Sequence, residues 1–431
     1  MSSYKVAFGS KAISVSITTE KFMAIISIAL ICLGVVNPIF SIAAFFINAV
    51  YFIFAKSDAI YYQMFFLIPF ANIFKYSRSS TSMFTYLTIL IVTVMFLKRK
   101  KCDLNFIIVF FIFAGYVAVG GNLNYTMILK QISIPLVIYC FFHYCNISFK
   151  KLICYLSVST ILSGFFALFR DSIPNLSRYI GKIKAWELES NNYRFTGLYT
   201  DPNYFSVVVI ICIIGILVLN MNKQINPLSL IMLAPLVLFG SYTISKSFLL
   251  MLGVIAVYYI FLFFKSKRYF WGILFSLITA FFAVMIFSGK IQMFSGVMDR
   301  FYDSIESGDI TTNRTNIWGR YIDYFGENIK CLFFGDGIGV GYLYGGAAAH
   351  NSFIDFIYYY GIIGTILFIS SCIIATGRKP ISGRRIPENY FMWICFLIMQ
   401  FFLSYVNTFD FSFIICIMVL AYRQRFTNTI E

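Results

Sequence analysis

The chain has 431 residues, of which 60% are hydrophobic and only 12% are charged, and its mean hydropathy is +0.81. A soluble protein carries about a quarter charged residues, so this composition excludes an ordinary soluble enzyme. The formal net charge of +16 therefore indicates contact with anionic membrane lipid rather than with nucleic acid.

Apolar runs of about 15 to 20 residues recur along the chain, and runs of this length are typical of membrane-spanning helices. The candidate segments lie near residues 22–37, 38–55, 59–74, 83–97, 105–120, 128–144, 151–169, 203–219, 228–243, 247–265, 270–287, 352–374, 389–405 and 408–421. We expect an all-α, polytopic integral membrane protein with roughly 11 to 14 spans and a single transmembrane domain, residues 1–431. Residues 1–21 show no apolar core or cleavage site, so we expect no cleaved signal peptide.

Basic residues gather in alternate connections between these segments, at Lys98–Lys101, Lys150–Lys151, 265–268, 378–385 and 423–425. Because Lys and Arg accumulate in cytoplasmic loops, this pattern predicts that both termini are cytoplasmic. The topology leaves two long outer segments, a first periplasmic loop at 170–202 and a second at 288–351 that contains a glycine-rich stretch. Long loops in a compact protein are usually functional.

The first outer segment ends in the sequence YRFTGLYTDPNYF, residues 193–205. Asp201 followed by Pro202 predicts the N-cap and the first residue of a helix. Arg194 lies near the expected membrane surface, where it either binds an anion or is solvated among lipid headgroups. Lys246, in SYTISKSFLL, falls in a very short outer turn, where a cation snorkels to the surface or pairs with an anion. Lys75 and Arg78 are further outer-side cations that could extend an anion site.

The second outer segment contains TTNRTNIWGRYIDYF, in which Trp318, Tyr321 and Phe325 have helical spacing. We expect an amphipathic helix on the membrane surface that includes Arg320. Arg314 would lie at its start, where the helix dipole does not favour a cation, which suggests another partner. The following GDGIGVGYLYGG, residues 335–346, lacks the Lys-Ser/Thr and the glycine register of nucleotide-binding loops. Its glycines instead suit a close approach of the backbone to a ligand or to the membrane surface.

His350 is the only histidine on the expected outer side, and it precedes the N-cap candidates Asn351 and Ser352 of the segment 352–374. A helix N-terminus pushes an imidazole toward its neutral form, which can accept a proton from a hydroxyl group. The alternative is a surface histidine that helps to cap the helix. The cysteines show no CxxC or Cys/His ligand spacing, so we expect no structural zinc.

The cations Arg194, Lys246 and Arg314 and the base His350 thus come from three separate outer connections. Arginine forks suit bidentate contact with phosphate oxygens, and such a set could clamp a lipid diphosphate and stabilise it as it leaves. The acceptor hydroxyl would need only a base that takes up its proton. One base and several cations are the smallest set of groups that sugar transfer from a polyprenyl diphosphate requires.

The same residues resemble the O-antigen polymerase and O-antigen ligase superfamily of bacterial inner-membrane glycosyltransferases, over roughly residues 190 to 370. The shared pieces are Arg194 with DPN before a span, SKS at 245–247, Arg314 followed by Trp318, and the glycine-rich run ending in HNSF before a span with Gly361 and Gly364. The resemblance implies a metal-independent, cofactor-free, inverting transferase of undecaprenyl-diphosphate-linked oligosaccharides at the periplasmic face. It implies catalytic roles for Arg194, Arg314 and His350, and we expect Lys246, Arg320, Asp201 and Asn351 to bind substrate. Many relatives carry arginine where Lys246 stands.

Within this superfamily we expect a polymerase that extends a surface polysaccharide such as O-antigen, with membrane lipid and a chain-length regulator protein as partners. One alternative is an O-antigen ligase, which transfers the glycan to lipid A–core, and another is a different envelope glycan transferase. A lipid-linked oligosaccharide flippase or secondary transporter is the alternative from another class. Transporters tend to place charged groups near the membrane midplane, whereas here the span interiors are nearly free of charge.

Overall fold

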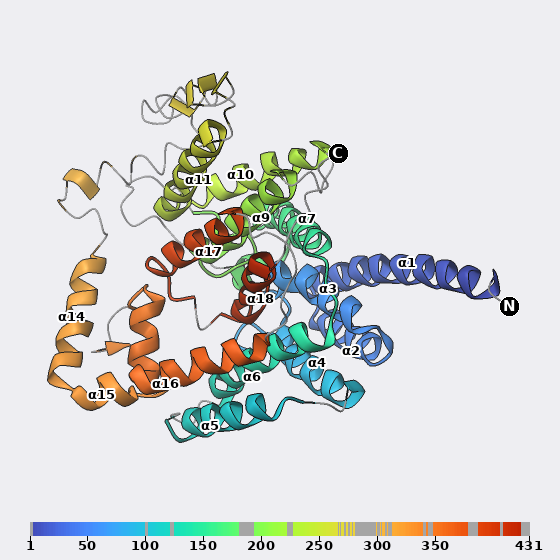
Figure 1. Ribbon diagram of the computed structural model, residues 1–431, viewed down its shortest axis with the longest axis horizontal. Coiled ribbons are helices and arrows are strands. Elements are labelled where there is room, and N and C mark those ends of the chain that lie inside the picture. Colours follow the sequence, from blue (N-terminus) through green and yellow to red (C-terminus); the bar gives the residue numbers. More distant parts are fainter. Residues whose placement is uncertain are drawn as a thin grey trace.

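The computed structural model describes residues 3–99, 102–120, 125–180, 194–221, 227–265, 313–338, 348–377, 387–405 and 408–423, with short stretches between 267 and 308 and at 342–343. The secondary-structure elements in these ranges are all helices (Figure 1). The chain is therefore all-α, as its sequence predicts.

Within the described part of the chain, five helices are long and apolar enough to cross a membrane. They are α6 (Tyr125–Tyr144), α7 (Phe149–Leu168), α9 (Pro202–Met221), α11 (Lys246–Lys265) and α16 (Ser352–Thr376). Shorter apolar helices are α2 (Pro38–Phe54), α5 (Leu104–Gly120), α10 (Leu233–Tyr242), α17 (Pro387–Gln400) and α18 (Phe411–Arg423). The remaining helices are α1 (Ser3–Gly34), α3 (Ser57–Leu67), η1 (Ile68–Phe70), α4 (Met83–Arg99), α8 (Leu176–Ile180), η2 (Pro227–Met232), α14 (Arg314–Glu327) and α15 (Ile329–Phe334).

These helices follow the predicted apolar segments, with breaks that the apolar runs do not reveal. The segment predicted at 59–74 changes from α3 to η1 next to Pro69, which has no backbone N–H to continue an α-helix. The segment predicted at 228–243 begins as η2 before it becomes α10. Most of the segment predicted at 270–287 lies outside the described residues, as do the basic stretch 378–385 and parts of both long outer segments.

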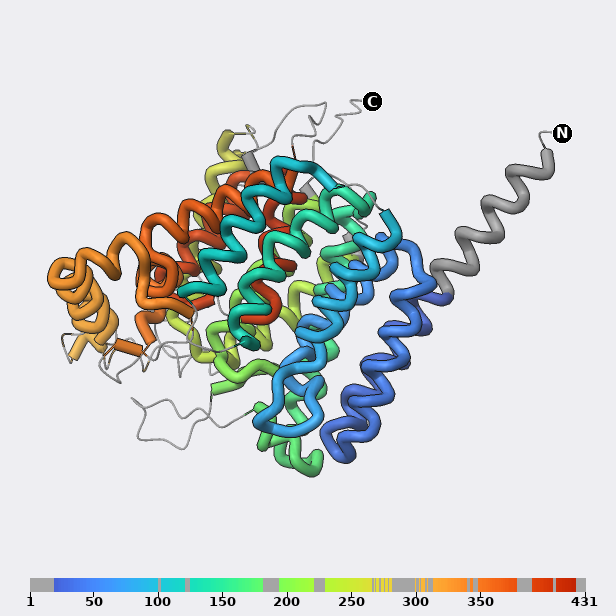
Figure 2. Tube along the Cα trace, turned by 90° about the horizontal axis from the view of Figure 1, so that it is seen from below, coloured from blue at the N-terminus to red at the C-terminus, as the bar shows by residue number. Residues whose placement is uncertain are grey.

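α9 occupies the middle of the helical assembly and contacts α7, α10, α11 and α17 (Figures 1 and 2). Within its apolar window, 83% of the residues are buried, as expected of a helix that is hydrophobic on all sides. Packing is close, because a Cβ on Gly215 would come within 2.6 Å of the Ile153 side chain. The polar residues at the N-terminus of α9 are thus attached to the best-packed element of the fold.

α16 is broken at Gly361, although its sequence reads as one continuous span. Gly361 has φ +63° and ψ −178°, and the two halves of the helix lie at a steep angle to each other (Figure 1). Carbonyl groups freed by the break accept hydrogen bonds from distant residues: Tyr358 O from Asp336 N at 2.8 Å, Tyr359 O from Gly337 N at 3.2 Å, and Tyr360 O from the Tyr116 hydroxyl at 2.7 Å. The segment after α15 and α5 therefore supply the bonds that lipid cannot supply.

Cations collect at one end of the bundle, where several helices finish. Lys98 Nζ donates to the carbonyl of Ala55 at 2.7 Å, at the C-terminus of α2. Arg423 donates to the carbonyl of Gly377, at the C-terminus of α16. Both placements suit the negative end of a helix dipole. The assignment of this end to the cytoplasm stays a prediction.

Candidate active site

Arg194 joins the segment before α9 to the turn between α10 and α11. Its side chain is only 9% exposed. Nε donates to Thr243 O at 3.0 Å, and a terminal nitrogen donates to Asn203 Oδ1 at 3.1 Å. A planar guanidinium held through two of its nitrogens has a fixed orientation. Arg194 is therefore a positioned, buried cation and not a solvated surface residue.

Asn203 connects the DPN sequence to the SKS sequence. Its backbone N donates to Asp201 Oδ1 at 2.7 Å, which confirms the predicted cap at the start of α9. Its side-chain oxygen accepts from Ser245 Oγ at 2.9 Å as well as from Arg194. Ser245 Oγ also lies 2.8 Å from Ser247 Oγ. Pieces of sequence that are more than 40 residues apart thus form one hydrogen-bonded cluster.

His350 has an unusual backbone and a polar neighbourhood. Its φ of +49° lies in the left-handed region, which is uncommon for residues other than glycine. Burial lowers the pKa of His350, the charge of Arg314 lowers it further, and the charge of Asp201 partly offsets both. The imidazole therefore lies within electrostatic reach of both residues and is neutral at pH 7. The sequence predicts that the helix dipole favours the neutral imidazole, whereas burial is the leading cause of the lowered pKa of His350.

α14 carries both a cation and a support for the His350 segment. Arg314 is its first residue, as predicted, and the guanidinium lies 5.9 Å from the centre of the Phe402 ring, within cation–π range. One turn further on, Trp318 Nε1 donates to Ala349 O at 2.8 Å. Because Ala349 directly precedes His350, this bond fixes the backbone from which the imidazole projects.

The helices that carry these residues all begin at this site. α9 begins at Pro202, α11 at Lys246, α14 at Arg314 and α16 at Ser352. The first turn of a helix exposes N–H groups without intrahelical partners and has a partial positive charge. Convergent helix starts therefore add to the charge of the arginines, and the site suits an anion such as phosphate.

The other predicted site residues have different surroundings. Lys246 Nζ donates to Ser304 Oγ. Asn351 Oδ1 accepts from Phe353 N at 2.9 Å and from Ile354 N at 3.3 Å, so it caps α16 as predicted. Arg320 is exposed on α14, six residues beyond Arg314 and on another face of the helix.

Hydrogen bonds and electrostatic contacts thus bring Arg194, Asp201, Arg314 and His350 into one region. Among the described residues, no contact joins Arg320 to this region. Asn351 adjoins the region because it follows His350 and caps α16. Lys246 follows Ser245, which belongs to the hydrogen-bonded cluster around Asn203.

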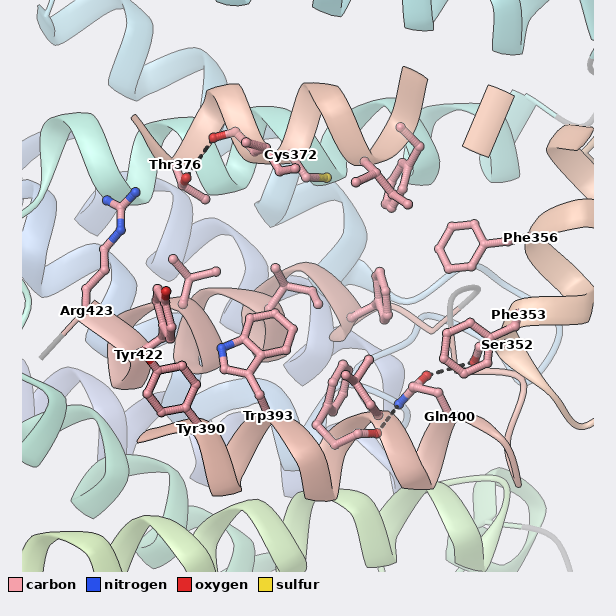
Figure 3. Close-up of a pocket in the computed structure, with 18 residues that line it drawn as sticks. Ser352, Phe353, Phe356, Cys372, Thr376, Tyr390, Trp393, Gln400, Tyr422 and Arg423 are labelled. Carbon is pink, nitrogen blue, oxygen red and sulfur yellow. Dashed lines mark hydrogen bonds between the residues drawn. The ribbon is translucent and has the colours of Figure 1, made fainter. Parts of the chain in front are cut away.

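An apolar groove of about 670 Å³ lies between α16, α17 and α18, and its first lining residue, Ser352, follows His350 by two positions in the sequence. Figure 3 shows Ser352, Phe353 and Gln400 at one end, Trp393 in the middle, and Tyr422 and Arg423 at the other end. The residues of α16 that line it extend from Ser352 to Thr376, at most about 36 Å at ~1.5 Å per residue. The hydrocarbon core of a bilayer is about 30 Å thick. Because α16 bends at Gly361, the groove is shorter than the upper limit for a straight helix, and its wall is apolar, as a lipid chain requires.

Several residues of this region were not identified from the sequence. Asn203, Thr243 and Ser245 hold the guanidinium of Arg194, directly or through one another. Asp410 is fully buried and its Oδ2 accepts from the hydroxyls of Tyr405 at 2.7 Å and Tyr199 at 3.2 Å. Asn203 and Ser245 lie in the DPN and SKS motifs, in which we expected Asp201 and Lys246 to bind substrate. Thr243 and Asp410 showed only a polar side chain at the edge of an apolar run, which is also typical of ordinary helix caps.

Among the described residues, no three His, Cys, Asp or Glu side chains come together as metal ligands would. Comparison of the chain with protein-family models, with curated proteins and with solved structures gives no match. The likeness to O-antigen polymerases and ligases rests on the sequence motifs described above.

Proposed function

We propose that this chain is a bacterial inner-membrane polymerase of O-antigen or a similar surface polysaccharide, which joins undecaprenyl-diphosphate-linked oligosaccharides by inverting glycosyl transfer. One observation carries the proposal. The half-buried imidazole of His350, whose pKa is lowered by burial and by Arg314, lies within electrostatic reach of Arg314 and Asp201 and two residues before the first lining residue of an apolar groove. A base, fixed cations and a lipid groove are what this reaction requires.

In the proposed reaction, a hydroxyl of the acceptor sugar attacks the anomeric carbon of the donor sugar. A new carbon–oxygen bond forms as the bond from that carbon to the diphosphate oxygen breaks. The proton of the hydroxyl passes to the neutral imidazole of His350. The diphosphate leaves with the bonding electron pair as an anion, and attack from the opposite face inverts the anomeric centre.

The cations stabilise the leaving diphosphate. Arg314 and Arg194 supply full positive charges, and the starts of α9, α11, α14 and α16 add the partial positive charge of their helix dipoles. Because Thr243 and Asn203 already hold Arg194, its charge requires little reorganisation when the diphosphate develops its own charge.

The apolar groove holds the polyprenyl chain of a lipid-linked substrate. Its Ser352 end lies two residues beyond His350, so a chain seated in the groove carries its diphosphate head to the base and the cations. Binding energy from the chain thus positions the reacting carbon, which is how remote contacts contribute to catalysis.

The test is the length distribution of surface polysaccharide in a deletion strain that is complemented with variants. We expect His350→Ala and Arg314→Ala to give a single capped repeat unit on a gel, with wild-type amounts of protein in the membrane. Arg178→Ala, which removes an exposed arginine of α8, should give the wild-type ladder. A normal ladder from His350→Ala would show that the imidazole is not the base.

Arg194 needs a gentler change, because its alanine variant would leave the carbonyl of Thr243 without its bond in the protein interior. Lysine keeps the charge but cannot reproduce a fork to Thr243 O and Asn203 Oδ1, so Arg194→Lys should restore only part of the ladder. Long chains that accumulate on the carrier lipid and are missing from lipid A–core would instead identify a ligase. Single units retained on the cytoplasmic side would identify a flippase.

A further inference from the structure

A second cavity, polar and separate from the lipid groove, lies next to the candidate active site. It has a volume of about 470 Å³, within the range of about 300–1,000 Å³ for small-molecule sites. Thr200 and Tyr204 line it, and they flank Asp201 and Asn203 in sequence. The two sites therefore share the segment that leads into α9.

Hydroxyl groups dominate the wall of this cavity. Ser79 and Ser80 come from the segment between η1 and α4, Thr126 from the first turn of α6, and Thr408 from the segment before α18. Hydroxyls both donate and accept hydrogen bonds, so such a wall suits the hydroxyls of a sugar. The Phe409 ring, which stacks on Tyr199 at 5.9 Å, adds an apolar face of the kind on which sugar rings pack.

Lys75 and Lys130 are the charged residues among the described lining of the cavity, which contains no carboxylate. Lys130 interacts electrostatically first with the buried carboxylate of Asp410, which is not part of the lining, and then with Lys75. Burial lowers the pKa of Lys75, because its ammonium group is partly removed from water. Both ammonium groups border one small cavity, so an anion between them is attracted by both.

We propose that this cavity binds an acidic sugar of the glycan, with the carboxylate between Lys75 and Lys130 and the ring hydroxyls on the serine and threonine side chains. The inference rests on the proposed glycan polymerase and adds its substrate class, a repeat unit that contains a uronic acid or a similar carboxylate-bearing sugar. The neighbouring cations at Arg194 and Arg314 take the diphosphate, so the protein has separate sites for its two anionic groups.

The test is a binding measurement on the purified full-length chain in lipid nanodiscs, by calorimetry, with sodium glucuronate, glucose and inorganic pyrophosphate as probes. Glucuronate should bind at least about tenfold more tightly than glucose, since a charge-assisted hydrogen bond contributes more than a neutral one. Lys75→Met and Lys130→Met should each reduce glucuronate affinity to that of glucose. Lys330→Met, which removes an exposed lysine of α15, should bind glucuronate as the wild type does.

The inference is overturned if glucuronate binds no better than glucose, or if both lysine variants keep the wild-type affinity. It is also overturned if pyrophosphate displaces glucuronate and depends on the same two lysines, because the cavity would then hold the diphosphate. Unfolding temperatures without ligand identify a variant that has lost its fold, and Lys75 lies outside the helices, where methionine is easily accommodated.

Failure of this inference is distinguishable from failure of the proposed function. Arg314→Ala and His350→Ala lie outside the cavity and should bind glucuronate normally while they lose chain lengthening. If glucuronate binds as expected but these variants leave the polysaccharide ladder unchanged, the polymerase is refuted and the sugar site stands. If these variants lose the ladder but the wild-type protein does not bind glucuronate, the polymerase stands and the sugar site is refuted.

Discussion

Replacement of Gly361 by alanine tests whether the break in α16 holds the site in place. Two effects act together at this position. Its φ of +63° and ψ of −178° belong to a backbone region that is essentially restricted to glycine, and a side chain there costs about 1–3 kcal/mol. A Cβ would also lie 2.4 Å from backbone atoms of Phe333 and Phe334, which cannot rotate away, and overpacking of this kind costs about 1–3 kcal/mol.

The sum, about 2–6 kcal/mol, is a large share of the ~5–15 kcal/mol that stabilises a typical folded protein. The thermal unfolding temperature of Gly361→Ala in detergent should therefore fall by several degrees or more. Chain lengthening should also fall in the protein that remains folded, because α15 and the first half of α16 must separate to admit the methyl group.

Gly253→Ala is the matched control. Gly253 lies within α11, and no heavy atom lies within 4 Å of the position of its Cβ. Alanine is the better helix former by up to about 1 kcal/mol, so this variant should unfold at the wild-type temperature or above. Equal unfolding temperatures for Gly361→Ala and Gly253→Ala would refute the reasoning, since α16 would then tolerate a straight path.

Further predictions concern single groups near the site. Tyr116→Phe removes a hydroxyl that bonds a freed carbonyl of α16, and should lower the free energy of unfolding by about 1–3 kcal/mol in chemical or thermal melts. Trp318→Phe loses the bond that holds the backbone before His350, and should slow chain lengthening more than it lowers the unfolding temperature. Asp201→Asn can still cap α9 but loses a charge that raises the pKa of His350. Because the base acts only when neutral, the acid limb of kcat/KM should move to lower pH, and an unmoved limb would separate Asp201 from the base.

The helices were largely predictable, because a membrane-spanning helix needs a long apolar run and such runs stand out in any sequence. The caps were predictable for a similar reason. The side-chain oxygens of Asp201 and Asn351 accept hydrogen bonds from backbone N–H groups two or three residues away. Each capping residue and the N–H group that it binds therefore lie within one short stretch of sequence. Arg314 at the start of α14 follows from the same local pattern.

The break at Gly361 was not predictable, since its partners are the backbone of Phe333 and Tyr116 from α5. The bonds that Ser245 donates to Asn203 and Arg194 donates to Thr243 also depend on how α9 packs against α10 and α11. The polar cavity is formed by elements from distant parts of the chain, and the apolar groove by the packing of the consecutive helices α16, α17 and α18. A single sequence contains no periodicity that reports which helices meet.

The break in α16 has a consequence for the groove as well as for stability. On a straight helix, Phe356 and Cys372 would project about 160° apart, at ~100° per residue, and could not line the same surface. Both line the groove, because the two halves of α16 take different directions at Gly361. The same change of direction sets the N-terminus of the first half, with Ser352 and Phe353, at one end of the groove. In the proposed reaction, straightening of α16 would therefore separate a lipid chain in the groove from His350, even in a protein that remained folded.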